Sequence, residues 1–321
     1  MKIIDVTLRD GGFVCDFDWP IQTAQAHFEL CGDLGIEVVE LGYWKQTAKS
    51  TSPFYNMNED VLAQIVNGNN SISAVAVMID FHYCSKNLDD YPQLGETRIE
   101  IIRLTSRRED LTEARVFARK LHQHTGLKIS LQIINVTGYS INELSALVYD
   151  LTADPDIYII GFADSHGGLN FAADYSRYSK IFADLATTGQ LWGMHLHNHT
   201  GRAVTNYWAL QSSGCSYMDV SCRGLGKGAG NLPTEYVLRN EDLPHLLDYY
   251  IGFEDGPLTI GKRDAFCLIS GRLSITDNYA RQAFELGLNS QEFYKVAKRL
   301  TNIKKDNFDK DQFLAIINNI L

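Results

Sequence analysis

The 321-residue sequence lacks several features that mark specialised classes of protein. Its six cysteines show no Cys-x-x-Cys spacing, so neither a zinc knuckle nor a dithiol redox motif is indicated. There is no window of the roughly 18 apolar residues that span a membrane, no apolar stretch of a signal peptide near the N-terminus, and no long Pro, Ser or Gln tract. We therefore expect an ordered cytoplasmic protein with reduced, structural thiols. Cys222 alone lies beside a glycine-rich loop, where it is either reactive or a small buried hydrophobe.

An excess of positive charge is also missing. The formal net charge is -10, with 29 Lys and Arg against 39 Asp and Glu. The chain therefore offers no broad electrostatic attraction to nucleic acid or to an anionic membrane surface. Hydrophobic residues make up 45% and charged residues 21%, which is an ordinary globular composition. We expect a small-molecule ligand, held by a local arginine or a metal ion if it is anionic.

Eight short apolar runs, rich in β-branched residues, recur along the chain. The mean step between them is about 30 residues, the length of one βαβ repeat. They are almost continuously apolar, as buried parallel strands are. The runs lie at residues 2–7, 37–43, 72–80, 99–105, 127–136, 157–164, 191–197 and 217–222.

Segments with helical spacing lie between these runs, for example IQTAQAHFELCGDLG. Eight strand–helix units predict a TIM barrel, the closed (β/α)8 cylinder of about 250 residues. The alternative is an open doubly wound sheet, in which a GxGxxG phosphate motif usually follows the first strand. Here that turn reads RDGGF, which favours the barrel. Past residue 240 helical segments follow one another without a strand, so we predict a barrel over residues 1–240 and a helical extension over residues 241–321.

Polar residues stand at the C-terminal ends of the predicted strands. Because every βα loop of a barrel opens on that face, the catalytic groups are expected to gather there. The residues are Arg9, Asp10, Tyr43, Asn135, Asp164, Ser165, His195 and His197, and a glycine-rich segment, RGLGKGAGN, follows the last strand and ends in Asn231.

His195 and His197 stand two residues apart at a strand end, so both imidazoles face the same side. With the carboxylate of Asp10 they form a predicted site for a divalent cation such as Mg, Mn or Co. The open positions of an octahedral ion suit a 2-oxo acid that binds through two oxygens. Asn231 is either a fourth ligand or a helix cap. The structural alternative is that the histidines are satisfied strand-end residues and that Arg9 and Asp10 form a simple ion pair.

Arg9 would place a fixed positive charge beside the predicted ion, where an enolate oxygen develops. Making or breaking a carbon–carbon bond next to a carbonyl requires that enolate. A second pair, His122 and His124, lies at the end of a predicted helix, where residues i and i+2 diverge, and is not expected to bind metal. RGLGKGAGN is either a phosphate cradle of backbone amides or a tight turn.

Four segments resemble the motifs of one enzyme family. TLRDGG matches the opening motif, HLHNHTGRAVTN resembles HxHNDxGxAxAN, GLGKGAGN resembles GxGxxAGN, and FADSHG resembles the strand-six D-(S/T)-x-G. The family is that of the metal-dependent barrel lyases, which includes 3-hydroxy-3-methylglutaryl-CoA lyase, isopropylmalate and homocitrate synthases, the transferase domain of pyruvate carboxylase and 4-hydroxy-2-oxovalerate aldolase. The resemblance covers the barrel and does not reach the extension.

The resemblance implies that Asp10, His195 and His197 bind the metal, that Asn231 lies near or on it, and that Arg9 acts at the enolate. RDGG is more similar to the oxovalerate aldolases than to the RDGEQ of the synthases, and the last loop is too short for the cysteine-bearing flap of the CoA lyase. This favours a divalent-metal-dependent aldolase that acts on a 2-oxo acid. The extension is then the expected docking region for a partner dehydrogenase, as in the resembling aldolases, or for a second copy of the chain.

Two positions depart from the family pattern. The oxovalerate aldolases carry a proton-transferring His three residues after the metal Asp, where this chain has Phe13, and His199 replaces the usual Asp or Asn after HxHN. The acid/base group is therefore open, with His199, His166 and Tyr43 as candidates. Asp164, in the strand-six motif, is also a candidate catalytic residue.

Other functions stay open on the same residues. A Claisen-type acyltransferase would use acetyl-CoA on the same metal platform. A barrel that binds metal and oxo acid without turnover would explain Phe13. A non-haem iron oxygenase shares the ligand set but usually has a β-sandwich fold, which the alternating strands and helices argue against.

Overall fold

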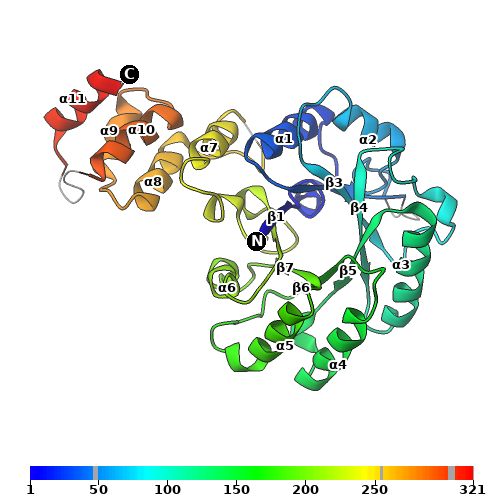
Figure 1. The fold of residues 1–321 in the computed structure, drawn as a ribbon. Coiled ribbons are helices and arrows are strands. Elements are labelled where there is room, and N and C mark those ends of the chain that lie inside the picture. Colours follow the sequence, from blue (N-terminus) through cyan, green and yellow to red (C-terminus); the bar gives the residue numbers. More distant parts are fainter. Residues whose placement is uncertain (46–49, 254–255, 303–307, 321) are drawn as a thin grey trace. The chain divides into compact units, whose positions relative to one another are not determined.

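The computed structural model describes residues 1–45, 50–253, 256–302 and 308–320 (Figure 1). The chain divides into two compact units, Met1–Tyr236 and Val237–Leu321. The first unit contains all eight strands of a closed barrel, and the second is helical in its described part. The predicted TIM barrel with C-terminal helices is therefore confirmed, and the division falls close to the predicted boundary after residue 240.

The barrel strands are parallel and follow one another in chain order, with β1 paired to both β2 and β8, so that the sheet closes. Each strand overlaps one of the eight apolar runs. The strands are β1 (Lys2–Asp5), β2 (Val38–Tyr43), β3 (Ala74–Asp80), β4 (Ile99–Ser106), β5 (Lys128–Ile133), β6 (Ile159–Asp164), β7 (Leu191–Leu196) and β8 (Tyr217–Val220).

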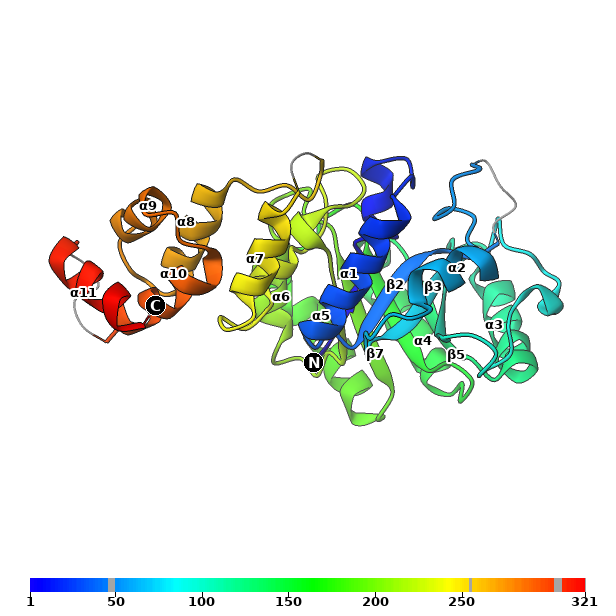
Figure 2. The same cartoon turned by 90° about the horizontal axis from the view of Figure 1, so that it is seen from above.

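The barrel unit has six helices in its described residues, and α1 is seen in front of the strands in Figure 2. They are α1 (Ile21–Asp33), α2 (Glu59–Val66), α3 (Leu111–Thr125), α4 (Ile141–Thr152), α5 (Tyr175–Thr187) and α6 (Ala203–Leu210). Short 3-10 turns complete the unit, namely η1 (Gly11–Val14), η2 (Leu88–Asp90), η3 (Val136–Gly138), η4 (Cys222–Gly224) and η5 (Thr234–Tyr236).

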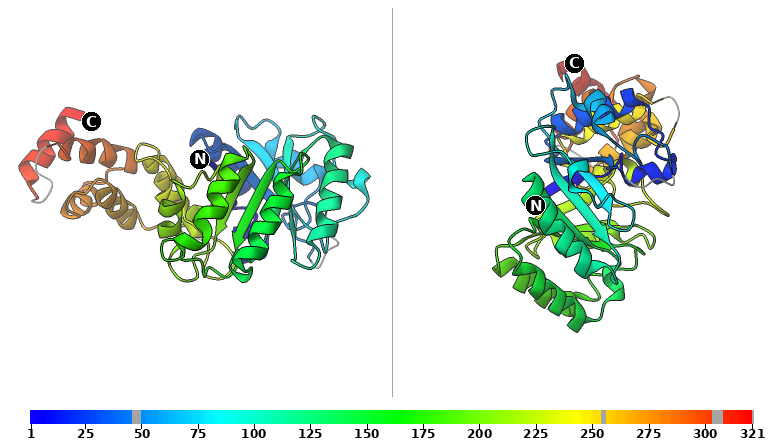
Figure 3. Two further views of the ribbon diagram at one scale, coloured as in Figure 1. Left: turned by 60° about the horizontal axis from the view of Figure 1, so that its bottom comes forward. Right: turned by 90° about the vertical axis from the view of Figure 1, so that its right-hand side faces the viewer.

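The repeat between β3 and β4 departs from the predicted strand–helix pattern. Its connection contains only η2, because residues 81–98 include Pro92 and Gly95 and lack a helical period of apolar residues. The barrel strands are seen inside the helical layer from two further directions in Figure 3.

The barrel interior changes from apolar to charged along the strands. One buried layer contains Ile4, Val6, Val38, Ala76, Ile101, Ile159 and Tyr217. Two residues further along three of these strands, on the same face, lie Glu40, Arg103 and Asp219, which are all buried. The apolar layer therefore closes the barrel below a charged layer at the C-terminal ends of the strands, where the predicted site lies.

The second unit contains α7 (Leu243–Ile251), α8 (Lys262–Arg272), α9 (Asn278–Glu285), α10 (Ser290–Leu300) and α11 (Lys310–Ile320). Its core includes Tyr250, Phe266 and Phe293, which are fully buried. Asn289 begins α10 with a capping box to Glu292. In the parts of both units that the structure describes, no helix is long and apolar enough to cross a membrane.

Candidate metal centre

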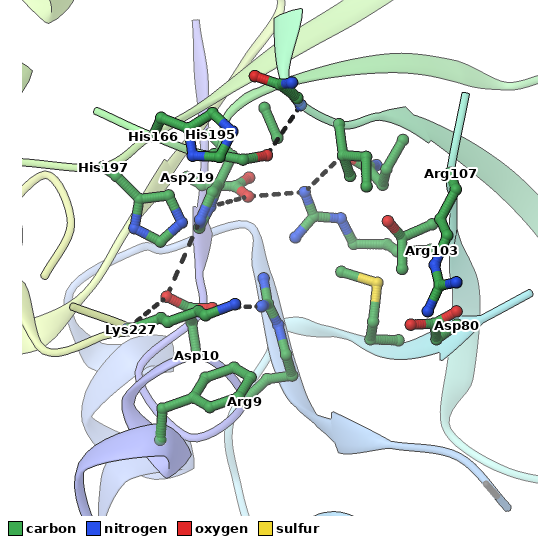
Figure 4. A pocket seen from close by; sticks show the side chains of 18 of the residues that line it. Arg9, Asp10, Asp80, Arg103, Arg107, His166, His195, His197, Asp219 and Lys227 are labelled. Carbon is green, nitrogen blue, oxygen red and sulfur yellow. Dashed lines mark hydrogen bonds and ion pairs between the residues drawn. The ribbon is translucent and has the colours of Figure 1, made fainter. Parts of the chain in front are cut away.

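Asp10, His195 and His197 meet at the C-terminal mouth of the barrel (Figure 4). One ligand atom from each lies within 4.8 Å of the others, and all three residues are buried. Asp10 follows β1, and the histidines come from the end of β7, next to β8 in the closed sheet. Barrel closure therefore brings together residues that are far apart in the sequence, as the strand-end positions predicted.

Hydrogen bonds at Nδ1 orient both imidazoles. His195 Nδ1 lies 2.9 Å from Asp219 Oδ2, and His195 Nε2 lies 3.9 Å from Asp10 Oδ2. His197 Nδ1 lies 3.4 Å from the carbonyl oxygen of Gly230. A proton on Nδ1 satisfies each contact and leaves a lone pair on Nε2 for a metal ion, which is the usual arrangement of a metal-binding histidine.

The charge state of the ligands also suits a cation. Burial, together with the neighbouring His195, lowers the pKa of His197 to about 4, so its imidazole is neutral at pH 7. Burial alone would raise the pKa of Asp10, but Arg9, followed by the two histidines, outweighs it and lowers the pKa to about 2. The site therefore presents one carboxylate and a neutral His197 ring.

Asn231 supplies the observation that a cation would explain. Its Nδ2 donates to Asp10 Oδ2 at 2.6 Å and to the Leu225 carbonyl at 3.0 Å. Its Oδ1 is buried and has no hydrogen-bond partner among the described residues, which is costly for a polar atom. The helix-cap alternative is wrong, because Asn231 forms a bridge with His197 and the next turn, η5, begins at Thr234. The residues therefore fit a divalent cation with Asn231 Oδ1 as a fourth protein ligand.

The glycine-rich loop after β8 folds against these ligands as a tight turn. Asn231 N donates to the Gly224 carbonyl, and Gly230 N donates to the Lys227 carbonyl. Lys227 N lies 3.4 Å from Asp10 Oδ2. These amides serve the loop itself and the Asp10 carboxylate, so they are not free to cradle a phosphate.

We expect the Gly226→Ala substitution to weaken divalent-cation binding roughly 10- to 100-fold, the range seen when contacts that support metal ligands are lost. A Cβ there would lie 2.2 Å from Asn231 Nδ2 and 2.5 Å from Asp10 Oδ2, so at least one ligand must move. Calorimetric titration with Mn²⁺ measures the affinity. Gly168→Ala is the matched control, because its Cβ meets no atom within 4 Å. Equal affinities in the two variants would contradict this geometry.

A buried ion-pair network supports the centre. Arg9 Nη1 lies 2.5 Å from Asp10 Oδ1 and its Nε lies 2.6 Å from Glu40 Oε2. Arg103 joins Glu40, at 3.1 Å, to Asp219, at 2.7 Å. Burial would raise the pKa of Asp219, but Arg103, followed by His195, lowers it. Negative and positive side chains thus alternate from Asp10 through this network to Asp219, the carboxylate that orients His195.

We expect Asp219→Asn to reduce Mn²⁺ affinity about 10- to 100-fold, because the loss of a carboxylate behind a ligating histidine has effects of this size. The neutral amide keeps the shape but makes the imidazole of His195 less basic. Calorimetry gives the affinity, and thermal unfolding shows whether the fold survives. Glu100→Gln, on the outer face of β4, is the control and should bind Mn²⁺ like the unaltered protein. If Asp219→Asn bound Mn²⁺ as tightly as the control, Asp219 would have no part in supporting the metal centre.

The centre opens into a cavity of about 710 Å³, which is within the range of small-molecule sites. One wall is aromatic and includes Phe13, Tyr43 and Tyr55, with Phe17 packed edge-on against all three. Another part is cationic and includes Arg107, Arg108 and Lys227. The cavity can therefore hold a substrate with both an anionic group and an apolar or ring-stacking part.

The candidate proton-transfer groups His199, His166 and Tyr43 all line this cavity. His199 Nε2 lies 3.1 Å from the Lys227 carbonyl, and its ring centre is 5.0 Å from that of His197. Burial raises the pKa of Tyr43, so its phenol stays protonated at neutral pH. Phe13, 40% exposed, takes the place where the resemblance leads us to expect a histidine.

Asp164 lies near enough to His199 and His166 to interact with their charges, but its own oxygens are engaged by backbone amides. Its Oδ1 accepts from Gly168 N at 3.0 Å and its Oδ2 from Leu169 N at 2.9 Å, so both oxygens hold the loop after β6. It is fully buried and is not among the residues that line the cavity. The carboxylate of Asp164 therefore has a structural role in this loop, and the catalytic role expected for it stays a prediction.

His122 and His124 also take separate partners. His122 Nδ1 lies 2.8 Å from the Leu127 carbonyl, whereas His124 Nε2 lies 3.1 Å from Asp89 Oδ1. They diverge on α3, as expected for residues i and i+2 of a helix.

Fold and site together define the class of protein, a TIM barrel with a candidate divalent-cation centre at its C-terminal mouth. The model of the HMGL-like family matches residues 1–243, and the chain belongs to that family. The resemblance stated from the motifs is thereby confirmed. Lyases of this family depend on divalent metal ions, in agreement with the ligand set found here.

Two relatives are similar over most of the barrel. The chain is 24% identical over 247 residues to 4-hydroxy-2-oxovalerate aldolase of Thermus thermophilus, which covers 73% of this chain and 67% of the relative. It is 24% identical over 252 residues to oxaloacetate decarboxylase of Mycobacterium tuberculosis, which covers 74% of this chain and 68% of the relative. Both names denote enzymes that cleave a carbon–carbon bond.

Solved structures share the fold. The carboxyl transferase domain of Rhizobium etli pyruvate carboxylase, determined with pyruvate and biocytin, superposes with a TM-score of 0.60 at 13% sequence identity. The match covers 99% of this chain and 61% of that chain.

Proposed function

We propose that the protein is a divalent-metal-dependent aldolase or lyase that makes or breaks the carbon–carbon bond next to the carbonyl of a 2-oxo acid, through an enolate. The observation that carries this proposal is the buried set of Asp10, His195, His197 and the unsatisfied Asn231 Oδ1, with Arg9 fixed beside it. The similarity to an oxovalerate aldolase and an oxaloacetate decarboxylase supports it, because both named substrates are 2-oxo acids.

Asp10, His195, His197 and Asn231 would hold the cation, for which Mg, Mn or Co is suited. Bound there, it would supply a Lewis acid for two oxygens of the substrate. The protein residues then have separate tasks. Asp219 orients His195, and the loop that ends in Asn231 closes the ligand set on the side of Asp10.

Arg9 would stabilise the negative charge that develops on the enolate oxygen. Its guanidinium is held by Asp10 on one side and Glu40 on the other, so it is oriented before the substrate binds. A preorganised charge of this kind stabilises a transition state without the cost of reorganisation. Because an arginine does not lose its proton, it would act as an electrostatic group and not as the acid.

A histidine of the cavity wall would carry the proton. His199 and His166 both line the cavity, and an imidazole can serve as a general acid or as a general base. Tyr43, with its raised pKa, would act only as a proton donor. A structure with bound pyruvate or oxalate would assign the role to the group within about 3 Å of the reacting carbon.

The test is enolate formation itself. Protein freed of metal with a chelator is incubated with pyruvate in D₂O, and exchange of the methyl protons is followed by NMR with and without added Mg²⁺, Mn²⁺ or Co²⁺. We expect exchange only with the metal. Exchange that is unaffected by the chelator would overturn the proposal.

Two further assays distinguish the alternatives. CoA release from acetyl-CoA with a 2-oxo acid would identify a Claisen-type acyltransferase. Calorimetric binding of metal and pyruvate without exchange or product would identify a binding barrel.

We also propose that the helical unit Val237–Leu321 serves association with a second copy of the chain or with a dehydrogenase that consumes an aldehyde product. The support is the family resemblance. Light scattering of the full chain, and of a chain that ends at Tyr236, measures the difference in oligomeric state.

A further inference from the structure

A second cluster of metal-ligating side chains lies between the barrel and its first helix. It consists of Asp5 on β1, His27 and Cys31 on α1, and Cys222 in η4, and each of these residues is at most 1% exposed. Asp5 points away from the barrel interior, because its neighbours Ile4 and Val6 belong to the inner apolar layer. The cluster is therefore separate from the centre at the barrel mouth.

Three of the donor atoms converge, and the fourth, Cys31 Sγ, lies against one of them. His27 Nε2 lies 2.8 Å from Asp5 Oδ1 and 3.5 Å from Cys31 Sγ. The ligand atoms of Asp5, His27 and Cys222 all lie within 4.8 Å of one another. Cys31 follows His27 by one helical turn, so both side chains are on the same face of α1.

We propose that Asp5, His27, Cys31 and Cys222 bind Zn²⁺ as a structural site. Cysteine sulfur, imidazole nitrogen and carboxylate oxygen are all zinc ligands, and four of them suit its tetrahedral coordination. With zinc–ligand bonds of about 2.0–2.3 Å, the ligand atoms of a tetrahedron lie roughly 3.3–3.8 Å apart. The 3.5 Å between His27 Nε2 and Cys31 Sγ is such a separation. To admit the ion, the imidazole and Asp5 would move slightly apart, and Cys31 would move toward Asp5 and Cys222.

Hydrogen-bond counting favours an ion over a simple Asp–His pair. The single proton or lone pair of His27 Nε2 serves one strong partner, yet the Asp5 carboxylate and the Cys31 sulfur both lie at contact distance from it. A divalent cation would deprotonate the thiols and give every donor in the cluster the same partner.

Thr7 fixes two of the ligands relative to each other. Its Oγ1 donates to Asp5 Oδ2 at 2.8 Å, and its backbone nitrogen donates to Asp5 Oδ1 at 3.0 Å. The same Oγ1 accepts from Cys222 N at 2.8 Å. Zinc here would thus connect β1 and α1 to the start of the glycine-rich loop. Asp10 follows β1, and Asn231 ends that loop. The proposal does not depend on the enzymatic activity.

Sulfur makes the site distinguishable from the centre at the barrel mouth, which has only nitrogen and oxygen ligands. The full-length protein is stripped of metal under reducing conditions and titrated with Co²⁺, and its near-ultraviolet absorption is recorded. We expect a thiolate-to-cobalt charge-transfer band that is displaced by about one equivalent of Zn²⁺. Asp10→Asn should keep this band, because its loss affects only the other centre.

Variants identify the residues that give rise to the charge-transfer band. Cys31→Ser and Cys222→Ser should each reduce it and lower the zinc content of the purified protein measured by mass spectrometry. Cys84→Ser is the matched control, since Cys84 is a buried free cysteine outside the cluster. Zinc removal should lower the melting temperature of the unaltered protein and of Cys84→Ser, but not that of Cys31→Ser. Absence of the band from the cobalt-loaded unaltered protein overturns the proposal, even if a variant fails to fold, and so does a Cys31–Cys222 disulfide in place of the metal.

Discussion

Replacing Asp10 by Asn is expected to abolish divalent-cation binding at the barrel mouth and, with it, metal-dependent exchange of the pyruvate methyl protons. Asp10 is the carboxylate of a ligand set otherwise made of imidazoles and an amide. Its pKa of about 2 keeps it charged throughout the neutral range, so the substitution removes a full negative charge. Because the loss of a group behind a ligand already costs about 10- to 100-fold in affinity or activity, the loss of the ligand itself should exceed that range.

Manganese binding to Asp10→Asn is measured by calorimetry and by the electron paramagnetic resonance signal of free Mn²⁺, and exchange is measured on the same samples. Asp80→Asn is the control, because Asp80 also lines the cavity but lies outside the ligand set. Asp80→Asn should bind Mn²⁺ as tightly as the unaltered protein. A variant at Asp10 that binds Mn²⁺ as tightly as the control would place the metal elsewhere in the molecule.

The strands and the clustering of the three candidate metal ligands could be predicted because both follow from local rules. Buried parallel strands are continuously apolar, and their C-terminal ends meet at one rim. Asp10 and the pair His195 and His197 each stand at such an end, and the period of two sends both imidazoles to the same side. No knowledge of distant contacts was needed for these residues.

The supporting network could not be predicted in the same way. Glu40, Arg103 and Asp219 interrupt apolar runs, and a charge inside a buried strand is itself a signal, since it requires a partner. Which charges pair depends on distances across the closed barrel. Arg103 on β4 meets Asp219 on β8, strands that are not neighbours in the sheet.

Asp164 shows that a position at a strand end does not by itself place a carboxylate in the cavity. Its position at a strand end satisfies the same rule as that of the metal ligands, but the next residues of the chain turn back so that Gly168 N and Leu169 N take both of its oxygens. Loop conformation decides whether a strand-end carboxylate faces the cavity or the backbone. The sequence of the loop, SHGGL, indicates a turn but not the direction of its amides.

Arg9→Gln is expected to lower kcat for carbon–carbon cleavage and for methyl exchange by about 10²- to 10³-fold, the usual effect of removing one preorganised group that stabilises an oxyanion. The cation should still bind, because Asp10, His195 and His197 are unchanged. The effect should fall on kcat more than on KM, since the enolate charge develops only in the transition state. Steady-state kinetics at saturating metal separate the two constants.

Arg9→Lys tests whether charge alone is enough. Glu40 and Asp10 hold the guanidinium from two sides, through Nε and Nη1, and a lysine ammonium lacks that planar fork. We therefore expect partial activity in Arg9→Lys, between that of Arg9→Gln and that of the unaltered protein. Arg107→Gln, an exposed arginine of the same cavity, controls for a general loss of positive potential and should keep kcat. If Arg107→Gln and Arg9→Gln lowered kcat equally, the field of the whole cavity, and not the fixed guanidinium at the ligand set, would stabilise the enolate.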